Sequence, residues 1–134
     1  MNSTSIRTVR DHLPSLEQFG VAVEYYPDYI NLAPEPHGVD ALLVSFTVRG
    51  TGRHWMNDTD YPESPGSLGI THYGEVHSIV TDPEGMDIYN LYLDPRTHPL
   101  PSMPLELNNM LHVLFAHRKA FRHRFNRSIH LHFK

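Results

Sequence analysis

The chain has 134 residues, of which 40% are hydrophobic and 19% are charged, and its formal net charge is −4. This length predicts one domain with its own core, and the composition is typical of a globular protein. The absence of cysteine excludes disulfides, cysteine-ligated zinc sites and thiol catalysis. No apolar run approaches the ~20 residues of a membrane span, and the N-terminus lacks the apolar segment of a secretory signal, so a cytoplasmic location is expected.

Short strand-like runs follow one another between glycines and prolines over the first hundred residues. They are rich in β-branched and aromatic residues, and the spacing of the glycines and prolines leaves little room for long helices. Many short strands at such intervals predict a sandwich or barrel rather than β–α–β units. The predicted strands are Gly20 to Tyr26, Ala41 to Arg49, Arg53 to Asn57, Ser67 to Thr71, His77 to Thr81 and Met86 to Leu93.

The run from Ala41 to Arg49 alternates between two faces. One face is apolar throughout and is predicted to meet the core or a partner chain; it consists of Leu42, Val44, Phe46 and Val48. The other face changes from apolar to polar through Leu43, Ser45 and Thr47. Such a change is expected where the inner face of a strand passes from packed core into a cavity.

The last thirty residues differ from the rest of the chain. A helix is predicted from about Pro104 to His117 by the spacing of its apolar residues, and a strand at 128–133 by alternation. On that strand His130 and His132 are interpreted as part of an exposed face. We expect residues 1–100 to form a barrel core and residues 101–134 to form a helical and strand extension of the same domain.

Charge is unevenly distributed along the chain. Residues 106–134 carry six lysines and arginines and one acid, whereas the rest is strongly acidic. The basic, aromatic-interleaved segment is compatible with a nucleic-acid surface or with a solvated face that lies against the acidic body. The sequence leaves both interpretations open.

The order of several short motifs resembles the N-terminal sensor domain of AraC-family transcription regulators, which is a cupin. The resemblance covers roughly residues 35–95 and rests mainly on Val48-Arg49-Gly50-Thr51-Gly52, Gly74-Glu75-Val76-His77 and Tyr92-Leu93-Asp94-Pro95. It implies a mainly β fold, a cupin jelly-roll barrel (double-stranded β-helix) with a ligand cavity, to which the predicted C-terminal helix is added.

The resemblance also implies a homodimer and a role in transcription regulation, without catalytic activity. In that family a helix-turn-helix domain follows the sensor domain. The present chain shows no such pattern, so contact with DNA is expected only through a helix-turn-helix domain that this chain does not contain.

Metal-binding cupins carry two motifs that together supply three histidines and a glutamate. In the second motif His77 occupies the histidine position, with Gly66 and Gly74 at the matching spacing. In the first motif, counted back from Gly50, the ligand positions are occupied by His37, Val39 and Leu43. Only His37 and His77 remain as possible ligands, and a transition metal needs three or four N or O donors. No metal or other cofactor is therefore expected.

The resemblance points instead to a sensor of a small polar metabolite, for example a sugar. In a sugar-binding member of the family, the histidine that matches His77 lies in the ligand pocket. Alternation along the strands places further polar and aromatic side chains on the same wall, and Trp55 is positioned to stack on a sugar face, to pack in the core or to contact a partner chain. The predicted ligand-binding residues are His37, Ser45, Thr47, Trp55, His77, Asn90 and Tyr92.

Two other functions remain open at this point. One is a small metal-dependent cupin enzyme, an isomerase or dioxygenase, that would use His37 and His77. The other is a dimerisation module whose barrel is filled by its own side chains. A cavity smaller than about 300 Å³ would be below the usual range of ligand pockets.

Overall fold

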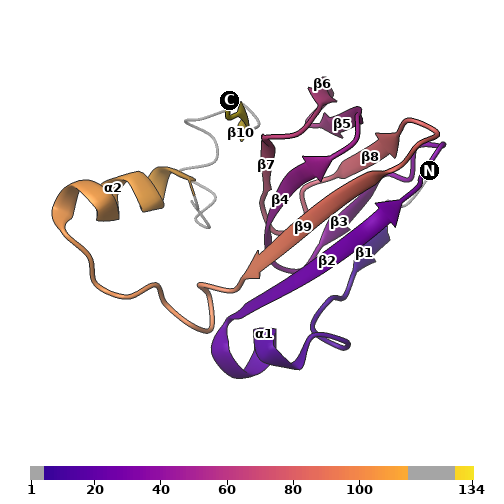
Figure 1. Ribbon diagram of the computed structural model, residues 1–134. Coiled ribbons are helices and arrows are strands. Elements are labelled where there is room, and N and C mark those ends of the chain that lie inside the picture. The colour runs from indigo at the N-terminus through magenta and orange to yellow at the C-terminus, as the bar shows by residue number, and fades with distance from the viewer. Residues whose placement is uncertain (1–4, 115–128) are drawn as a thin grey trace.

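The computed structural model describes residues 5–114 and 129–134, which form two facing five-stranded sheets (Figure 1). Sheet A has the strand order β1-β3-β8-β5-β6, and sheet B has the order β10-β7-β4-β9-β2. The elements are β1 Ser5–Arg7, α1 Pro14–Phe19, β2 Val21–Tyr29, β3 His37–Val39, β4 Leu42–Arg49, β5 Gly52–Met56, β6 Thr59–Glu63, β7 Ser67–Thr71, β8 His77–Thr81, β9 Met86–Leu93, α2 Leu105–Leu114 and β10 Ile129–His132.

The two antiparallel-rich sheets confirm the predicted mainly β jelly-roll fold. All six predicted strands are present, as β2, β4, β5, β7, β8 and β9, and the predicted helix and last strand appear as α2 and β10. Positions 115–117 of that helix and position 128 of that strand lie outside the described residues. Within the described part of the chain, neither helix is long and apolar enough to cross a membrane.

Four elements were not predicted, and each has a physical reason. Strands β1 and β3 have three residues each, too few for alternation to be visible. Strand β6 is polar and contains Pro62, which is tolerated because β6 is the edge of sheet A and pairs only with β5. Helix α1 is a six-residue turn that starts at Pro14 and ends at Gly20, whose φ of 73° favours glycine.

The alternation predicted for β4 separates the interior from the outer surface. Leu43 and Ser45 point into the space between the sheets and line a cavity there. On the opposite face Leu42 is buried, whereas Phe46 and Val48 are 36% and 44% exposed. The apolar face of β4 therefore belongs only partly to the core, and its far half lies on the outer surface of sheet B.

The core closes one end of the barrel. It consists of a cluster of buried apolar side chains from the N-terminal segment, α1, β2, β3, β4 and β9, namely Val9, Leu16, Ala22, Val39, Ala41, Leu43 and Tyr92. Figure 1 shows α1 beside the start of β2, at this end of the molecule. The core also forms part of the cavity wall, because Leu43, Val39 and Tyr92 belong to both.

A fully buried carboxylate, Asp94, ties the N-terminal segment to this end of the barrel. It accepts hydrogen bonds from the guanidinium group of Arg10, the hydroxyl of Tyr73 at 2.5 Å and the hydroxyl of Thr97 at 2.5 Å. Burial raises the pKa of Asp94, but these three donors outweigh it and hold that pKa well below the ordinary value of 3.8.

We predict that Asp94→Asn lowers the free energy of unfolding by about 2–3 kcal/mol at neutral pH, because charge-assisted hydrogen bonds of a buried group are lost. Since the folded-state pKa is depressed, the stabilisation by Asp94 is complete above the unfolded-state pKa. It is lost as the pH falls from about 4 towards the lower folded-state value. Urea unfolding between pH 7 and 2 should therefore show a steeper acid-side loss for the native chain than for Asp94→Asn.

The exposed Asp11 provides the control. Asp11→Asn should change the free energy of unfolding by less than about 0.5 kcal/mol. Equal stabilities for the two variants would contradict the role assigned to Asp94.

Candidate functional site

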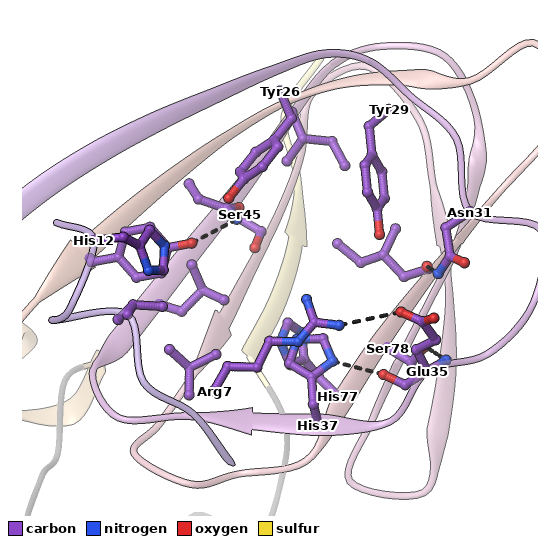
Figure 2. A pocket seen from close by; sticks show the side chains of 17 residues that line it. Arg7, His12, Tyr26, Tyr29, Asn31, Glu35, His37, Ser45, His77 and Ser78 are labelled. Atoms are coloured by element: carbon purple, nitrogen blue, oxygen red, sulfur yellow. Dashed lines mark hydrogen bonds and ion pairs between the residues drawn. The ribbon is translucent and has the colours of Figure 1, made fainter. Parts of the chain in front are cut away.

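A cavity of about 170 Å³ lies between the two sheets, on the side where β1 and β3 face β2 and β9 (Figure 2). Its walls combine apolar, aromatic and polar side chains from six strands and the segments beside them. The lining residues are Arg7, Val9, His12, Tyr26, Tyr29, Asn31, Glu35, His37, Val39, Leu43, Ser45, His77, Ser78, Ile79, Ile88, Asn90 and Tyr92.

Five of the seven residues predicted from the sequence line this cavity: His37, Ser45, His77, Asn90 and Tyr92. Thr47 and Trp55 are not among the lining residues. Thr47 is buried further along β4 and donates a hydrogen bond to Glu63 Oε2 at 2.8 Å. Trp55 alternates with the buried His54 and Met56 on β5, and is itself only half-buried.

The metal position of the cupin motifs falls on the cavity wall, and the side chains present do not fit a metal there. The rings of His37 and His77 are 4.6 Å apart, but Val39 and Leu43 provide no donor atom. The Nδ1 atoms of both histidines also have partners, since that of His37 lies 2.7 Å from the carbonyl of Glu35 and that of His77 lies 2.9 Å from His54 Nε2. The residues at the motif positions thus support no metal-dependent chemistry.

Three buried polar atoms of the lining side chains have no hydrogen-bond partner among the described residues. They are Ser45 Oγ, His77 Nε2 and Asn90 Oδ1. The first and last belong to sheet B and the second to sheet A, so they come from both walls of the cavity. An unpartnered buried polar group costs about 1–3 kcal/mol, so three of the side chains that line the cavity each carry a polar atom that the described residues leave unsatisfied.

The orientation of His77 depends on a chain of hydrogen bonds that begins at Glu63. His54 Nδ1 lies 3.1 Å from Glu63 Oε1, and His54 Nε2 lies 2.9 Å from His77 Nδ1. His54 is 0% exposed and Glu63 is 4% exposed, so the chain is shielded from water. Gly69 permits this arrangement because a Cβ atom there would lie 3.0 Å from His54 Nδ1.

The protonation states in this series of hydrogen bonds follow from the groups at its two ends, Glu63 and His77. Burial raises the pKa of Glu63, but hydrogen bonds from His54, His130 and Thr47 outweigh it and lower that pKa below 4.5, so the carboxylate is ionised. Burial, reinforced by the neighbouring imidazoles of His54 and His37, lowers the pKa of His77 well below 6.5, so His77 is neutral.

If His54 carries a single proton, the ionised carboxylate places it on Nδ1, which leaves His54 Nε2 as an acceptor. His77 must then donate its proton from Nδ1, and His77 Nε2 carries a lone pair. With a singly protonated His54, the hydrogen-bond pattern thus makes His77 Nε2 an acceptor.

Charged groups at the cavity compensate one another. Arg7 and Glu35 form an ion pair at 3.3 Å, with side chains 53% and 65% exposed. Figure 2 shows the Arg7 side chain extending to Glu35 beside the rings of His37 and His77. The charges of this pair at the cavity thus compensate each other.

Sequence reasoning missed Glu63, His54 and His130 as a group. His130 was interpreted as exposed, and this was wrong: its Nε2 lies 2.8 Å from Glu63 Oε1, and its side chain is 7% exposed. His54 and Met56 lie two residues apart on the same face of β5, and this alternation indicates that His54 points into the interior. The polar sequence around Glu63 gave no indication that this carboxylate is buried.

Comparison with known structures gives matches at low sequence identity. A mutant of oxalate decarboxylase from Bacillus subtilis has 21% identity and a TM-score of 0.46, over 66% of this chain and 24% of that chain. An apo variant of ToxT from Vibrio cholerae has 10% identity and a TM-score of 0.42, over 64% and 36%. The plu4264 protein from Photorhabdus luminescens has 14% identity and a TM-score of 0.43, over 87% and 92%.

The chain thus spans about a quarter of the length of that oxalate decarboxylase and about a third of ToxT. No curated protein matches the chain. A family model does match: that of the AraC-like ligand-binding domain, over residues 23–99, which contain the strands β4 to β9 and most of the cavity lining. With its barrel, its cavity and this match over more than half of its length, the chain belongs to the AraC-like ligand-binding domain family.

Proposed function

We propose that this domain senses a small neutral metabolite rich in hydroxyl groups, such as a sugar or a related polyol, for a transcription regulator of the cytoplasm. The observation that carries the proposal is the set of three unpartnered polar atoms, Ser45 Oγ, His77 Nε2 and Asn90 Oδ1, on two facing walls of one cavity. A hydroxyl group both donates and accepts, so a polyol satisfies two acceptors and a serine together.

The size of the cavity restricts the proposal to a compact ligand, because it falls below the limit of about 300 Å³ given above, as a barrel filled by its own side chains would. Its 170 Å³ lies below the 300–1,000 Å³ of pockets for drug-sized ligands. The enclosed part of the ligand must therefore be small. The aromatic lining residues Tyr26, Tyr29 and Tyr92 offer flat apolar surface for the carbon skeleton.

The charge of the cavity supports a neutral ligand. Arg7 and Glu35 are paired with each other, and His77 offers a lone pair rather than a positive charge. A carboxylate or phosphate would therefore meet an acceptor at His77 and another at Asn90 Oδ1, which disfavours anions.

Regulation in this proposal runs through a homodimer, with any DNA contact made by a separate helix-turn-helix domain. An exposed apolar row on the outer surface of sheet B supports the dimer. Phe46 on β4 pairs with Tyr89 on β9, which pairs with Tyr25 on β2, and the two tyrosine rings stack at 4.5 Å. All three are at least 36% exposed, and Val21, Val23 and Val48 on the same face are exposed too.

We predict that Ser45→Ala weakens binding about tenfold, which is about 1.4 kcal/mol, while the apo protein melts at the same or a higher temperature. The stability is not reduced because the Ser45 hydroxyl has no hydrogen-bond partner to lose in the described part of the chain. Thermal shift measurements with pentoses, hexoses and small polyols, each beside its sugar-acid counterpart, test this, because ligands of the native state raise its melting temperature. The neutral compounds should raise the melting temperature and the acids should not.

Thr71→Val is the matched control. Thr71 Oγ1 is also buried and unpartnered among the described residues, but Thr71 does not line the cavity. This variant should match Ser45→Ala in apo stability and bind like the native chain. If no compound raised the melting temperature, or if both variants weakened binding equally, the proposed sensing site would be refuted.

The dimer gives a separate prediction. Phe46→Glu should raise the dimer dissociation constant at least about tenfold, because a charge would replace an aromatic contact near the centre of the interface. Leu32→Glu, at a position that is 62% exposed outside sheet B, should leave it unchanged. Sedimentation velocity over a concentration series measures both, and a native chain that stays monomeric at every concentration would contradict the dimer.

A further inference from the structure

A second group of buried ionisable side chains lies on the far side of His77 from the cavity. We call His54, Glu63 and His130 the His–Glu–His cluster; they come from β5, β6 and β10. Their side chains are 0%, 3% and 7% exposed. The cluster bridges the open edges of the two sheets, because β6 is the edge of sheet A and β10 is the edge of sheet B.

The donor atoms converge as the ligands of one ion would. Glu63 Oε1 lies 3.1 Å from His54 Nδ1 and 2.8 Å from His130 Nε2, and all three atoms lie within 4.8 Å of one another. Around a tetrahedral zinc ion with bonds of about 2.0–2.1 Å, ligand atoms are separated by about 3.3 Å. The two distances to Glu63 need changes of a few tenths of an ångström to reach that geometry, and the two histidine nitrogens, which lie within 4.8 Å of each other, must reach the same separation.

Each member is held by a further side chain, as metal ligands usually are. Thr47 donates a hydrogen bond to the other carboxylate oxygen of Glu63 at 2.8 Å. His77 binds the other ring nitrogen of His54 at 2.9 Å, and the ring of Tyr61 stacks on that of His130 at 4.7 Å. These contacts fix the orientation of all three donors.

We propose that the His–Glu–His cluster binds a divalent transition-metal ion, for which Zn²⁺ is the best match to two imidazoles and one carboxylate. The three protein donors leave a fourth position for water. This site uses neither His37 nor the ring nitrogens of His77, so it is distinct from the metal position of the cupin motifs. It also fastens β10 to β5 and β6, which lie far from it in the sequence.

The bound ion would change His77 Nε2 from a hydrogen-bond acceptor into a donor, and this step rests on the proposed ligand site. Coordination takes the lone pair of His54 Nδ1, so the single proton of a neutral His54 must sit on Nε2. His54 Nε2 then donates to His77 Nδ1, and the proton of His77 moves to Nε2. No proton is gained or lost, but the cavity-facing atom changes from acceptor to donor, so the metal selects which ligands the cavity prefers.

The test uses the full chain without an affinity tag, freed of metal by a chelator and titrated with Zn²⁺ by calorimetry and with Co²⁺ by absorption. One equivalent should bind, with the visible bands of four-coordinate Co²⁺. His130→Ala should weaken Zn²⁺ binding more than the about 10- to 100-fold cost of losing a residue that only orients a ligand. Glu63→Gln, which keeps the shape of the side chain, should weaken it as well.

His132→Ala is the matched control, because His132 lies two residues along the same strand, is exposed, and binds only the carbonyl of Pro65 at 3.1 Å among the described residues. With eleven histidines in the chain, this pair of variants separates the cluster from surface binding. If Zn²⁺ did not bind, or if His130→Ala and His132→Ala had equal effects, the metal site would be refuted.

Nitrogen-15 NMR of the imidazoles tests this change at His77 without any ligand. His77 Nε2 should be unprotonated in the metal-free chain and protonated after one equivalent of Zn²⁺. Zn²⁺ binding with an unchanged His77 would refute the change from acceptor to donor while the metal site stood. Both readouts are independent of the sugar and polyol screen, so failure of the proposed sensing function would be seen separately.

Discussion

The burial of one carboxylate, Glu63, determines how the buried polar side chains around it are arranged. A carboxylate removed from water must be satisfied by donors, and Glu63 obtains them from Thr47, His54 and His130 on three different strands. This requirement orients the ring of His54, and through His54 it orients the ring of His77. It also brings β10 against β6, so the same group that orients the cavity wall closes the edge between the sheets.

The interior therefore has two compartments that share His77. On one side lies a cavity with apolar, aromatic and polar walls, and on the other lies a dry cluster of ionisable groups. A ligand at His77 Nε2 and an ion at His54 Nδ1 would act on opposite ends of the same hydrogen-bonded pair. Any coupling between them would be reciprocal, because each changes the free energy of the other's bound state by the same amount.

Most of the strands and much of the cavity wall could be predicted from the sequence. Alternation identified the inner face of β4, and the motif order singled out His37 and His77, which the register of β3 and β8 pairs directly. The prediction failed where local pattern carries little information. Strand β6 contains a proline and polar residues, and the short β1 and β3 have no visible period.

The sequence by itself determined the fold class, the family and the loss of the cupin metal ligands, because periodicity, glycine spacing and the side chains at motif positions are local properties. Only the tertiary structure decided which polar residues meet. Thr47 and Trp55 were predicted in the cavity and are not among its lining residues, while His130 reached Glu63 across 67 positions of the chain. Such contacts depend on how the edges of two sheets face each other, and no local pattern encodes that.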